Sequence, residues 1–320
     1  MAPSLTISPR SVPHTFMNFP LCTELDALEA DVAILGFPFG DPYSMEEVTN
    51  DQTNAPTAVR RMSHKASRDL DRWDFDLGGT LFDGRDVRVV DCGDVPGDRH
   101  DMGEHYRRGE EATRKILEKG ALPIVIGGDH GIPIPVLRAY QGHGPVTLVH
   151  IDAHIDWRDH INGVREGYSS TIRRASEMAH IDRIVQIGMR AQGSARAEEV
   201  EVALAYGADI VPAHEVHSQG MDAVLDRIPE NGRYYLTIDA DGLDPTEMPA
   251  VNSPAPGGIL FHQMRTLIHG LVSKGRVVGM DIVEITPSKD VNSITVITAG
   301  RIMLNLIGMA ARAGYFDRAR

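Results

Sequence analysis

Short apolar runs alternate with amphipathic segments along most of this chain. Several of the runs are rich in Val and Ile and lack the polar alternation of a half-exposed strand. Such runs are typical of strands that are covered on both faces of a parallel sheet. The pattern predicts eight strands, over residues 31–39, 87–95, 122–126, 146–151, 184–189, 210–213, 234–238 and 277–283.

Segments with helical periodicity lie between these runs. Two of them stop at Gly120 and Gly207, and glycine suits the position just after a helix end. The last segment is apolar on most sides, so we expect it to be largely buried. The predicted helices span residues 102–119, 194–206, 221–228, 261–274 and 293–311.

This alternation continues without an internal repeat, a low-complexity tract or a linker. We therefore predict one three-layer α/β/α domain over residues 31–320, with a central, mostly parallel eight-stranded sheet. Residues 1–30 are punctuated by Pro and Ser and are predicted to form an N-terminal surface segment. In open parallel sheets the ligand site lies beyond the carboxyl ends of the strands, so chemically active residues are expected there.

The stretch from His150 to Asp156 follows one of the apolar runs. Residues two apart on an extended strand point to the same side. Asp152, His154 and Asp156 are therefore expected to project together. Two carboxylates around one imidazole suit a divalent metal ion that accepts oxygen and nitrogen ligands.

Three other strand ends carry similar residues. The run at 122–126 leads into His130, the run at 234–238 into Asp239 and Asp241, and the run at 277–283 into Glu284. A single buried histidine is more often a hydrogen-bonded structural residue than a ligand. Several carboxylates at one sheet edge without cations, however, would cost many kcal/mol, because like charges would share a site of low dielectric. Taken together, these residues favour a metal site.

Composition narrows the function further. The chain has 320 residues, 42% of them hydrophobic, and 32 basic against 45 acidic residues give a net charge of −13. This argues against nucleic acid, because phosphate binding needs a basic surface. Two cysteines, Cys22 and Cys92, form no metal-binding pair, and we see neither a signal peptide nor a membrane span. We expect a cytoplasmic protein.

Four ordered segments of this chain resemble those of the ureohydrolases, the family of arginase, agmatinase and guanidinobutyrase. They are GGDH at 127–130, DAHID at 152–156, DADGLDP at 239–245 and GMDIVEITP at 279–287. The resemblance covers nearly the whole chain. The SPAPGG segment at 253–258 is more similar to the agmatinase branch than to arginase.

The resemblance implies an arginase-like fold and a centre of two metal ions, Mn²⁺ or Ni²⁺. It implies that a hydroxide bridging the ions attacks a small cationic guanidino compound, releasing urea and an amine. Asp156 would orient the hydroxide and pass on its proton, and Glu284 would hold the guanidinium. One ion would be bound by His130, Asp152, Asp156 and Asp239, and the other by His154, Asp152, Asp239 and Asp241.

The chain departs from the family pattern at three places. Tyr168 stands where many agmatinase-like members have a histidine assigned to proton transfer or substrate positioning. A phenol is a poor proton relay at neutral pH but can donate a hydrogen bond to a substrate. His160 is the nearest alternative proton relay, although we favour the interpretation that His160 is a solvated loop residue. The loop at 41–54 is acidic and lacks arginine, and Gly131 replaces a frequent serine. All three places are expected to border the pocket mouth.

These departures leave alternatives open. Agmatine and guanidinobutyrate are the default substrates, and guanidine, an N-alkylguanidine or a biguanide of the metformin type is the second substrate class. A hypothesis of another kind is a non-catalytic partner subunit in a hetero-oligomer. The resemblance itself implies a homo-oligomer, a trimer or hexamer. A zinc deacetylase of related architecture fits poorly, because such enzymes use adjacent histidines and this chain has none.

Overall fold

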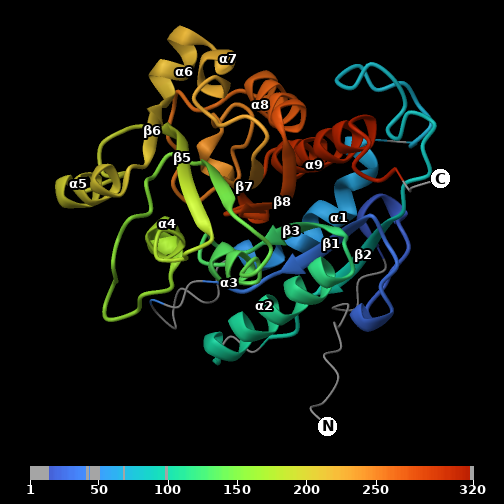
Figure 1. The fold of residues 1–320 in the computed structure, drawn as a ribbon, viewed down its shortest axis with the longest axis horizontal. Coiled ribbons are helices and arrows are strands. Elements are labelled where there is room, and N and C mark those ends of the chain that lie inside the picture. Colours follow the sequence, from blue (N-terminus) through green and yellow to red (C-terminus); the bar gives the residue numbers. More distant parts are fainter. Residues whose placement is uncertain (1–13, 41–42, 44–50, 68, 98–99, 318–320) are drawn as a thin grey trace.

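The computed structural model describes residues 14–40, 43, 51–67, 69–97 and 100–317 (Figure 1). Each of the eight predicted strands is present, with bounds shifted by a few residues. They are β1 (Val32–Phe37), β2 (Val89–Asp94), β3 (Leu122–Gly127), β4 (Val146–Ile151), β5 (Ile181–Met189), β6 (Asp209–Pro212), β7 (Arg233–Asp239) and β8 (Arg276–Val283).

The strands form one sheet in the order β2-β1-β3-β8-β7-β4-β5-β6. Every pairing between neighbouring strands is parallel. The predicted α/β class and the eight-stranded sheet are therefore confirmed. The last two strands of the chain, β7 and β8, are inserted between β3 and β4, which makes these four strands neighbours at the centre of the sheet.

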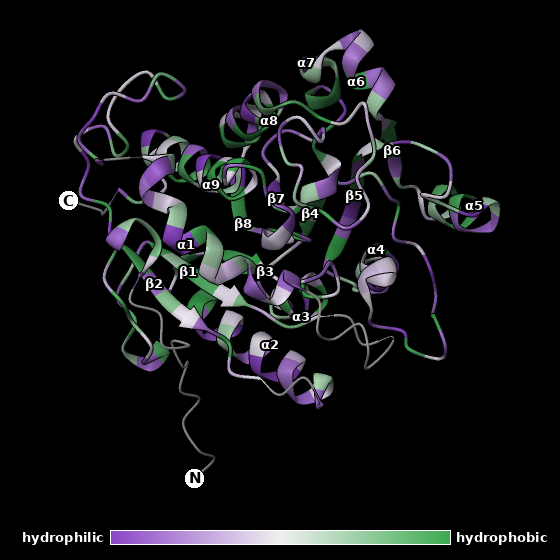
Figure 2. Ribbon diagram, turned by 180° about the vertical axis from the view of Figure 1, so that it is seen from behind, coloured by the Kyte–Doolittle hydropathy of each residue, from purple (hydrophilic) through white to green (hydrophobic). Residues whose placement is uncertain are grey.

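Helices cover both faces of the sheet, as Figures 1 and 2 show. Strand alternation explains the two layers: Val32 and Ile34 of β1 belong to one hydrophobic core, whereas Ala33 and Leu35 belong to the other. One core is closed by α1 (Ala55–Ala66), α6 (Ala213–Gln219), α7 (Met221–Leu225), α8 (Phe261–Lys274) and α9 (Ile294–Arg312). The other is closed by α2 (Met102–Glu118), α3 (Pro133–Arg138), α4 (Thr171–Ala175) and α5 (Ala197–Tyr206).

The five predicted helices correspond to α2, α5, α7, α8 and α9. The prediction for α7 was too long at its end, because the helix stops at Leu225 rather than at residue 228. Four helices were not predicted: α1, α3, α4 and α6. Three of them have seven residues or fewer, so they span too few turns to show a periodic apolar stripe.

Helix α9 is long and apolar enough to cross a membrane by length and composition alone. Most of its residues are buried, however, and it packs against α1 and α8. Its apolar character is thus explained by a place in the protein core, as the sequence predicted.

The described part of the N-terminal segment, residues 14–30, runs beside the edge strand β2. Leu21 bridges to Asp91, and the amide of Cys22 donates to the Asp91 carbonyl at 2.9 Å. Phe16 and Leu25 are buried. This part contributes to the core, although it was predicted as a surface segment; residues 1–13 lie outside the described residues.

The register of the central strands aligns their carboxyl ends. Ile151 of β4 pairs with Ile238 of β7, Ile238 with Ile282 of β8, and Ile282 with Ile126 of β3. These four isoleucines form one fully buried row across the sheet. Residues that follow this row within a few positions therefore emerge at the same edge, and they include Asp152, Asp239, Glu284 and His130.

Candidate metal centre

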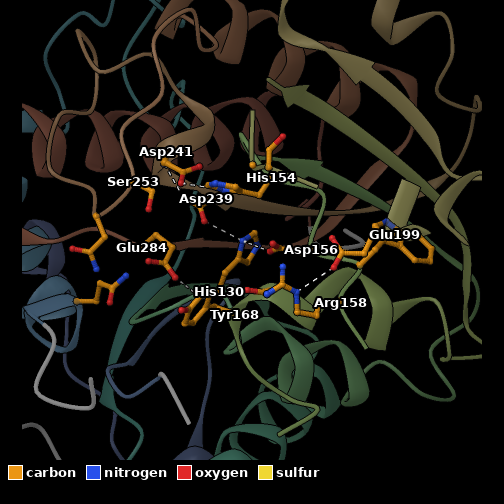
Figure 3. Close-up of a pocket in the computed structure, with 16 residues that line it drawn as sticks. His130, His154, Asp156, Arg158, Tyr168, Glu199, Asp239, Asp241, Ser253 and Glu284 are labelled. Carbon is orange, nitrogen blue, oxygen red and sulfur yellow. Dashed lines mark hydrogen bonds and ion pairs between the residues drawn. The ribbon is translucent and has the colours of Figure 1, made fainter. Parts of the chain in front are cut away.

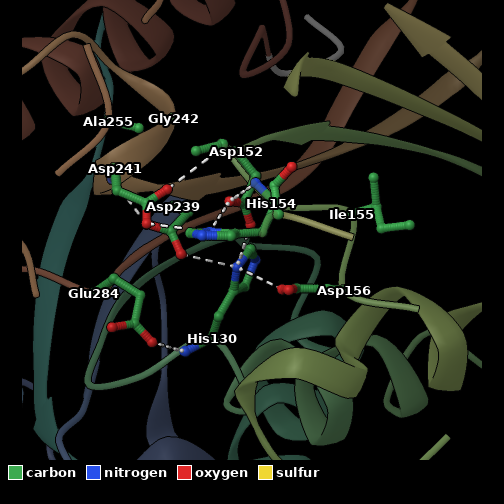
Figure 4. A network of polar contacts seen from close by, with 12 residues as sticks. His130, Asp152, His154, Ile155, Asp156, Asp239, Asp241, Gly242, Ala255 and Glu284 are labelled. Carbon is green, nitrogen blue, oxygen red and sulfur yellow. Dashed lines mark hydrogen bonds and ion pairs between the residues drawn. The ribbon is translucent and has the colours of Figure 1, made fainter. Parts of the chain in front are cut away.

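Three carboxylates surround the ring of His130 (Figure 4). Its Nδ1 atom lies 2.9 Å from Oδ2 of Asp152, 3.2 Å from Oδ2 of Asp156 and 3.2 Å from Oδ2 of Asp239. All four side chains are buried. These are the residues that the family resemblance assigned to one ion.

A second group of side chains adjoins the first. The Nδ1 atom of His154 lies 3.3 Å from Oδ1 of Asp152 and 3.3 Å from Oδ2 of Asp241. Asp152 thus presents one oxygen to each histidine. The main-chain amide of Asp241 donates to Oδ1 of Asp239 at 2.8 Å, which joins the two groups. The structure brings all six predicted ligands together.

The hydrogen bonds of His130 indicate which ring nitrogen is free for a ligand. Thr237 donates its hydroxyl proton to Oδ1 of Asp281 at 2.7 Å. The Thr237 oxygen can then accept the Nε2 proton of His130, 3.1 Å away. The buried Nδ1 atom instead faces the oxygens of Asp152, Asp156 and Asp239. A cation is the group that both the nitrogen and the carboxylates can bind, so this donor set fits a metal.

The electrostatics of the cluster agree with this fit. Burial and the neighbouring carboxylates raise the pKa of Asp239 well above its usual value, and the same causes raise the pKa of Asp156. Burial opposes a charged His154, but Asp152 and Asp241 outweigh burial and raise its pKa to about 12. The acidic groups thus need positive charge nearby, which protons or divalent ions can supply.

His150 also belongs to this network, although sequence reasoning gave it no role. Its Nε2 atom lies 2.8 Å from Oδ2 of Asp152, and its Nδ1 atom lies 2.9 Å from the amide nitrogen of Gln186. The side-chain oxygen of Gln186 accepts from the indole of Trp157 at 2.6 Å. Since the Gln186 amide donates to Nδ1, the Nε2 atom carries the proton and donates it to Asp152. His150 therefore orients the central carboxylate.

The predicted geometry of the DAHID segment was wrong, although the residues do converge. Strand β4 ends at Ile151, and Asp156 has a left-handed backbone with φ of 52°. Asp152, His154 and Asp156 therefore converge from a bent segment beyond the strand end and not from an extended strand. Asp241 likewise lies in a short 3₁₀ turn at Ala240–Gly242 rather than on β7.

Glu284 lies beside His130 at the end of β8. Its Oε1 atom accepts the main-chain amide proton of His130 at 2.8 Å, and its backbone φ is 63°. A non-glycine residue pays a conformational penalty there, and such strain is common where a side chain is aimed at a site. Burial, with Asp239 and Asp129 nearby, raises the pKa of Glu284 well above its usual value.

One partly buried arginine, Arg190, holds the loop that carries Asp241. The guanidinium of Arg190 donates to the main-chain carbonyls of residues 188, 241, 242, 243 and 255, at 2.6–3.2 Å. Such an array needs the planar fork of arginine, which an ammonium group lacks. Arg190 therefore fixes the backbone on both sides of Asp241, a role that no motif revealed.

Replacing Arg190 by lysine is expected to weaken metal binding about 10- to 100-fold, the usual effect of removing a group that orients metal ligands. The loss should fall on the candidate site that contains Asp241 and His154, so metal analysis should show fewer ions per chain at limiting metal. Arg183→Lys is the control, because Arg183 donates to one carbonyl at the surface. Equal metal affinity in Arg190→Lys and the wild type would contradict this role.

A cavity of about 440 Å³ opens onto the cluster (Figure 3). Tyr168 lines it, and its ring contacts that of Tyr43 edge to face, with centroids 4.7 Å apart. The hydroxyl of Tyr43 accepts the amide proton of Ser169 at 3.2 Å. Tyr43 therefore packs behind two residues of the cavity lining, Tyr168 and Ser169. His160 is exposed and contacts Asp159, as expected of a solvated loop residue.

The other two departures from the family pattern differ in whether they line the cavity. Gly131 is buried and does not line the cavity, contrary to expectation. A Cβ atom there would lie 2.4 Å from the hydroxyl of Tyr106, so a larger residue would not fit without movement. Gln52 of the loop at 41–54 lines the cavity; residues 41–42 and 44–50 lie outside the described residues.

Comparisons with known proteins agree with this geometry. A model of the arginase family matches residues 30–308. The guanidinobutyrase of Pseudomonas aeruginosa is 33% identical over 290 residues, which cover 89% of this chain and 87% of that protein. The agmatinase of Proteus mirabilis is 31% identical over 306 residues, with 92% of each chain covered. The structure of proclavaminate amidino hydrolase from Streptomyces clavuligerus superposes with a TM-score of 0.82 at 29% identity, covering 96% of this chain and 100% of that one.

Proposed function

The chain belongs to the arginase family and is a ureohydrolase-type hydrolase, and we propose that it cleaves a C–N bond of a guanidino compound with the aid of two metal ions. The observation that carries the proposal is the buried Nδ1 atom of His130, which lies 2.9–3.2 Å from the oxygens of three carboxylates. Urea and an amine would be the products.

The ligands of the two ions follow from the two groups of side chains. One ion would be held by His130, Asp152, Asp156 and Asp239, and the other by His154, Asp152, Asp239 and Asp241. Oxygen and imidazole ligands accept both Mn²⁺ and Ni²⁺. When bound, such a pair of ions makes water acidic enough to act as a nucleophile near neutral pH.

The protein side chains position the reactants. Glu284 is proposed to accept hydrogen bonds from the guanidinium of the substrate, a pairing suited to parallel N–H donors. Asp156 faces the same cavity as Glu284. It is proposed to orient the attacking water and to carry a proton to the leaving amine.

A panel of guanidino compounds tests this function. Agmatine and 4-guanidinobutyrate are the default substrates. Guanidine, N-alkylguanidines and biguanides form the second class. The presence of Tyr168 in place of the family histidine favours this second class. The protein should be loaded with Mn²⁺ or Ni²⁺, its metal content measured, and release of urea or amine followed. If a chain with both sites filled hydrolyses none of these compounds, the proposal is wrong.

Tyr168→His tests whether the side chain of Tyr168 contacts the substrate. Tyr168 lines the cavity and contacts Tyr43. If its hydroxyl forms a hydrogen bond with the substrate, the variant should shift its preference toward agmatine by about tenfold in relative kcat/KM. That factor corresponds to one hydrogen bond to a charged group. Tyr206→His, at a tyrosine outside the cavity, is the control. An unchanged profile in Tyr168→His would argue against this role.

Assembly and location are also part of the proposal. We propose a cytoplasmic homo-oligomer, a trimer or hexamer, as the family resemblance implies. Trp73 and Phe75 are 63% and 90% exposed, which suits a surface covered by another subunit. The alternative, a non-catalytic subunit of a hetero-oligomer, would be revived if the purified protein bound no metal. Light scattering of the purified chain would give its mass in solution.

A further inference from the structure

Arg158 lines the cavity from the loop that follows β4. It lies two residues beyond Asp156, and its main-chain amide donates to the carbonyl of Ser169 at 3.0 Å. Figure 3 shows its guanidinium between Glu199 and the side chains of the metal cluster. A positive group is thus held at one side of a cavity whose base is acidic.

An ion pair fixes the orientation of Arg158. Its Nε atom donates to Oε1 of Glu199 at 3.1 Å. The other oxygen of Glu199 accepts the main-chain amide proton of Arg196 at 3.0 Å, at the start of α5. Glu199 is only 12% exposed. Both of its oxygens are engaged, so Glu199 anchors Arg158 and is a poor receptor for a cationic substrate.

The terminal amino groups of Arg158 remain available as donors. Within the described part of the chain, no hydrogen bond or ion pair engages them, since the Nε atom makes the contact with Glu199. Arg158 is also the only Lys or Arg among the described residues that line this cavity. The remaining lining away from the metal cluster consists mainly of neutral groups, including Ser169, Ser194 and Asn252.

We infer that Arg158 binds an anionic group at the far end of the substrate, so that the preferred substrate is a guanidino carboxylate. This inference rests on the proposed function and names its substrate class. The guanidinium end would meet Glu284, and the carboxylate end would meet the two free amino groups of Arg158, which can bind it in a bidentate manner. The same charge repels the terminal ammonium of agmatine.

Three substrates of similar length separate the effect of tail charge from that of size. They are 4-guanidinobutyrate, with an anionic tail; agmatine, with a cationic tail; and butylguanidine, with a neutral tail. The metal-loaded wild type should give its highest kcat/KM with 4-guanidinobutyrate. In Arg158→Gln this value should fall roughly 10- to 100-fold, mainly through KM, while values for butylguanidine change little and those for agmatine do not fall.

Arg158→Lys retains the charge without the planar fork and should recover part of the preference for the carboxylate. Arg114→Gln is the matched control, because Arg114 pairs with Glu110 on the exposed face of α2. A wild type that prefers agmatine, or an equal fall with all three substrates in both Arg158 variants, would overturn the inference. Absence of turnover on any guanidino compound, with both metal sites filled, would instead refute the proposed function.

Discussion

Replacing Asp152 by asparagine is expected to abolish hydrolysis, with a loss of roughly 10³-fold or more in kcat. Asp152 is fully buried and contacts three histidines: His130 at 2.9 Å, His150 at 2.8 Å and His154 at 3.3 Å. Asparagine keeps the shape but presents only one oxygen and no charge. Since Asp152 faces both groups of ligands, the variant should lose affinity for both ions.

Thermal unfolding separates this effect from misfolding. Burial opposes ionisation of Asp152, but three histidines lower its pKa, so the ionised carboxylate stabilises the fold, and metal-free Asp152→Asn should unfold at a lower temperature than the metal-free wild type. Added Mn²⁺ or Ni²⁺ should raise the Tm of the wild type but not that of Asp152→Asn, because only a bound ligand stabilises the folded state. Asp182→Asn, at an exposed position near the opposite end of the sheet, is the control. Full metal binding in Asp152→Asn would contradict the central role of Asp152.

Glu284→Gln is expected to lower kcat/KM by about 10²- to 10³-fold while leaving the metal content unchanged. One oxygen of Glu284 accepts from the His130 amide, and glutamine can retain that bond. The other oxygen would be exchanged for an amide nitrogen, a donor that cannot accept a hydrogen bond from a guanidinium. The loss should therefore fall on substrate binding and the transition state.

Metal analysis and kinetics together decide this prediction. Glu230→Gln is the control, since Glu230 is 66% exposed and pairs with Lys274. A fall in metal content that parallels the fall in activity would place Glu284 among the metal ligands. Equal activity of Glu284→Gln and the wild type would show that Glu284 does not bind the substrate.

Local chemistry explains why much of the fold was predictable. Strands buried on both faces must be apolar throughout, so β1, β3 and β4 were visible as continuous Val- and Ile-rich runs. The longer helices, such as α2 and α8, span enough turns to show a periodic pattern and end near Gly120 and Gly275. Helix α3, with six residues and two prolines, lacked such a signal.

The sequence by itself determined the strands and the class of fold, because apolar runs are local properties, and it indicated the six candidate ligands through the resemblance to the ureohydrolases. Only the tertiary structure decided that β7 and β8 lie between β3 and β4, which brings His130 to Asp239. It also decided the partners of those ligands: His150, Thr237 and Arg190 act through hydrogen bonds between distant segments, and no local pattern encodes such contacts.

The DAHID segment shows the same division. Its residue types indicated a metal site, but the residues converge through a bend after β4 and the left-handed backbone of Asp156, not through extended-strand alternation. Arg158 was visible in the sequence, but a single arginine after the DAHID segment does not by itself indicate a substrate contact. Its value as a substrate contact depends on Glu199 occupying the Nε atom and leaving the terminal amino groups free. Packing of α5 against the loop after β4 creates that arrangement.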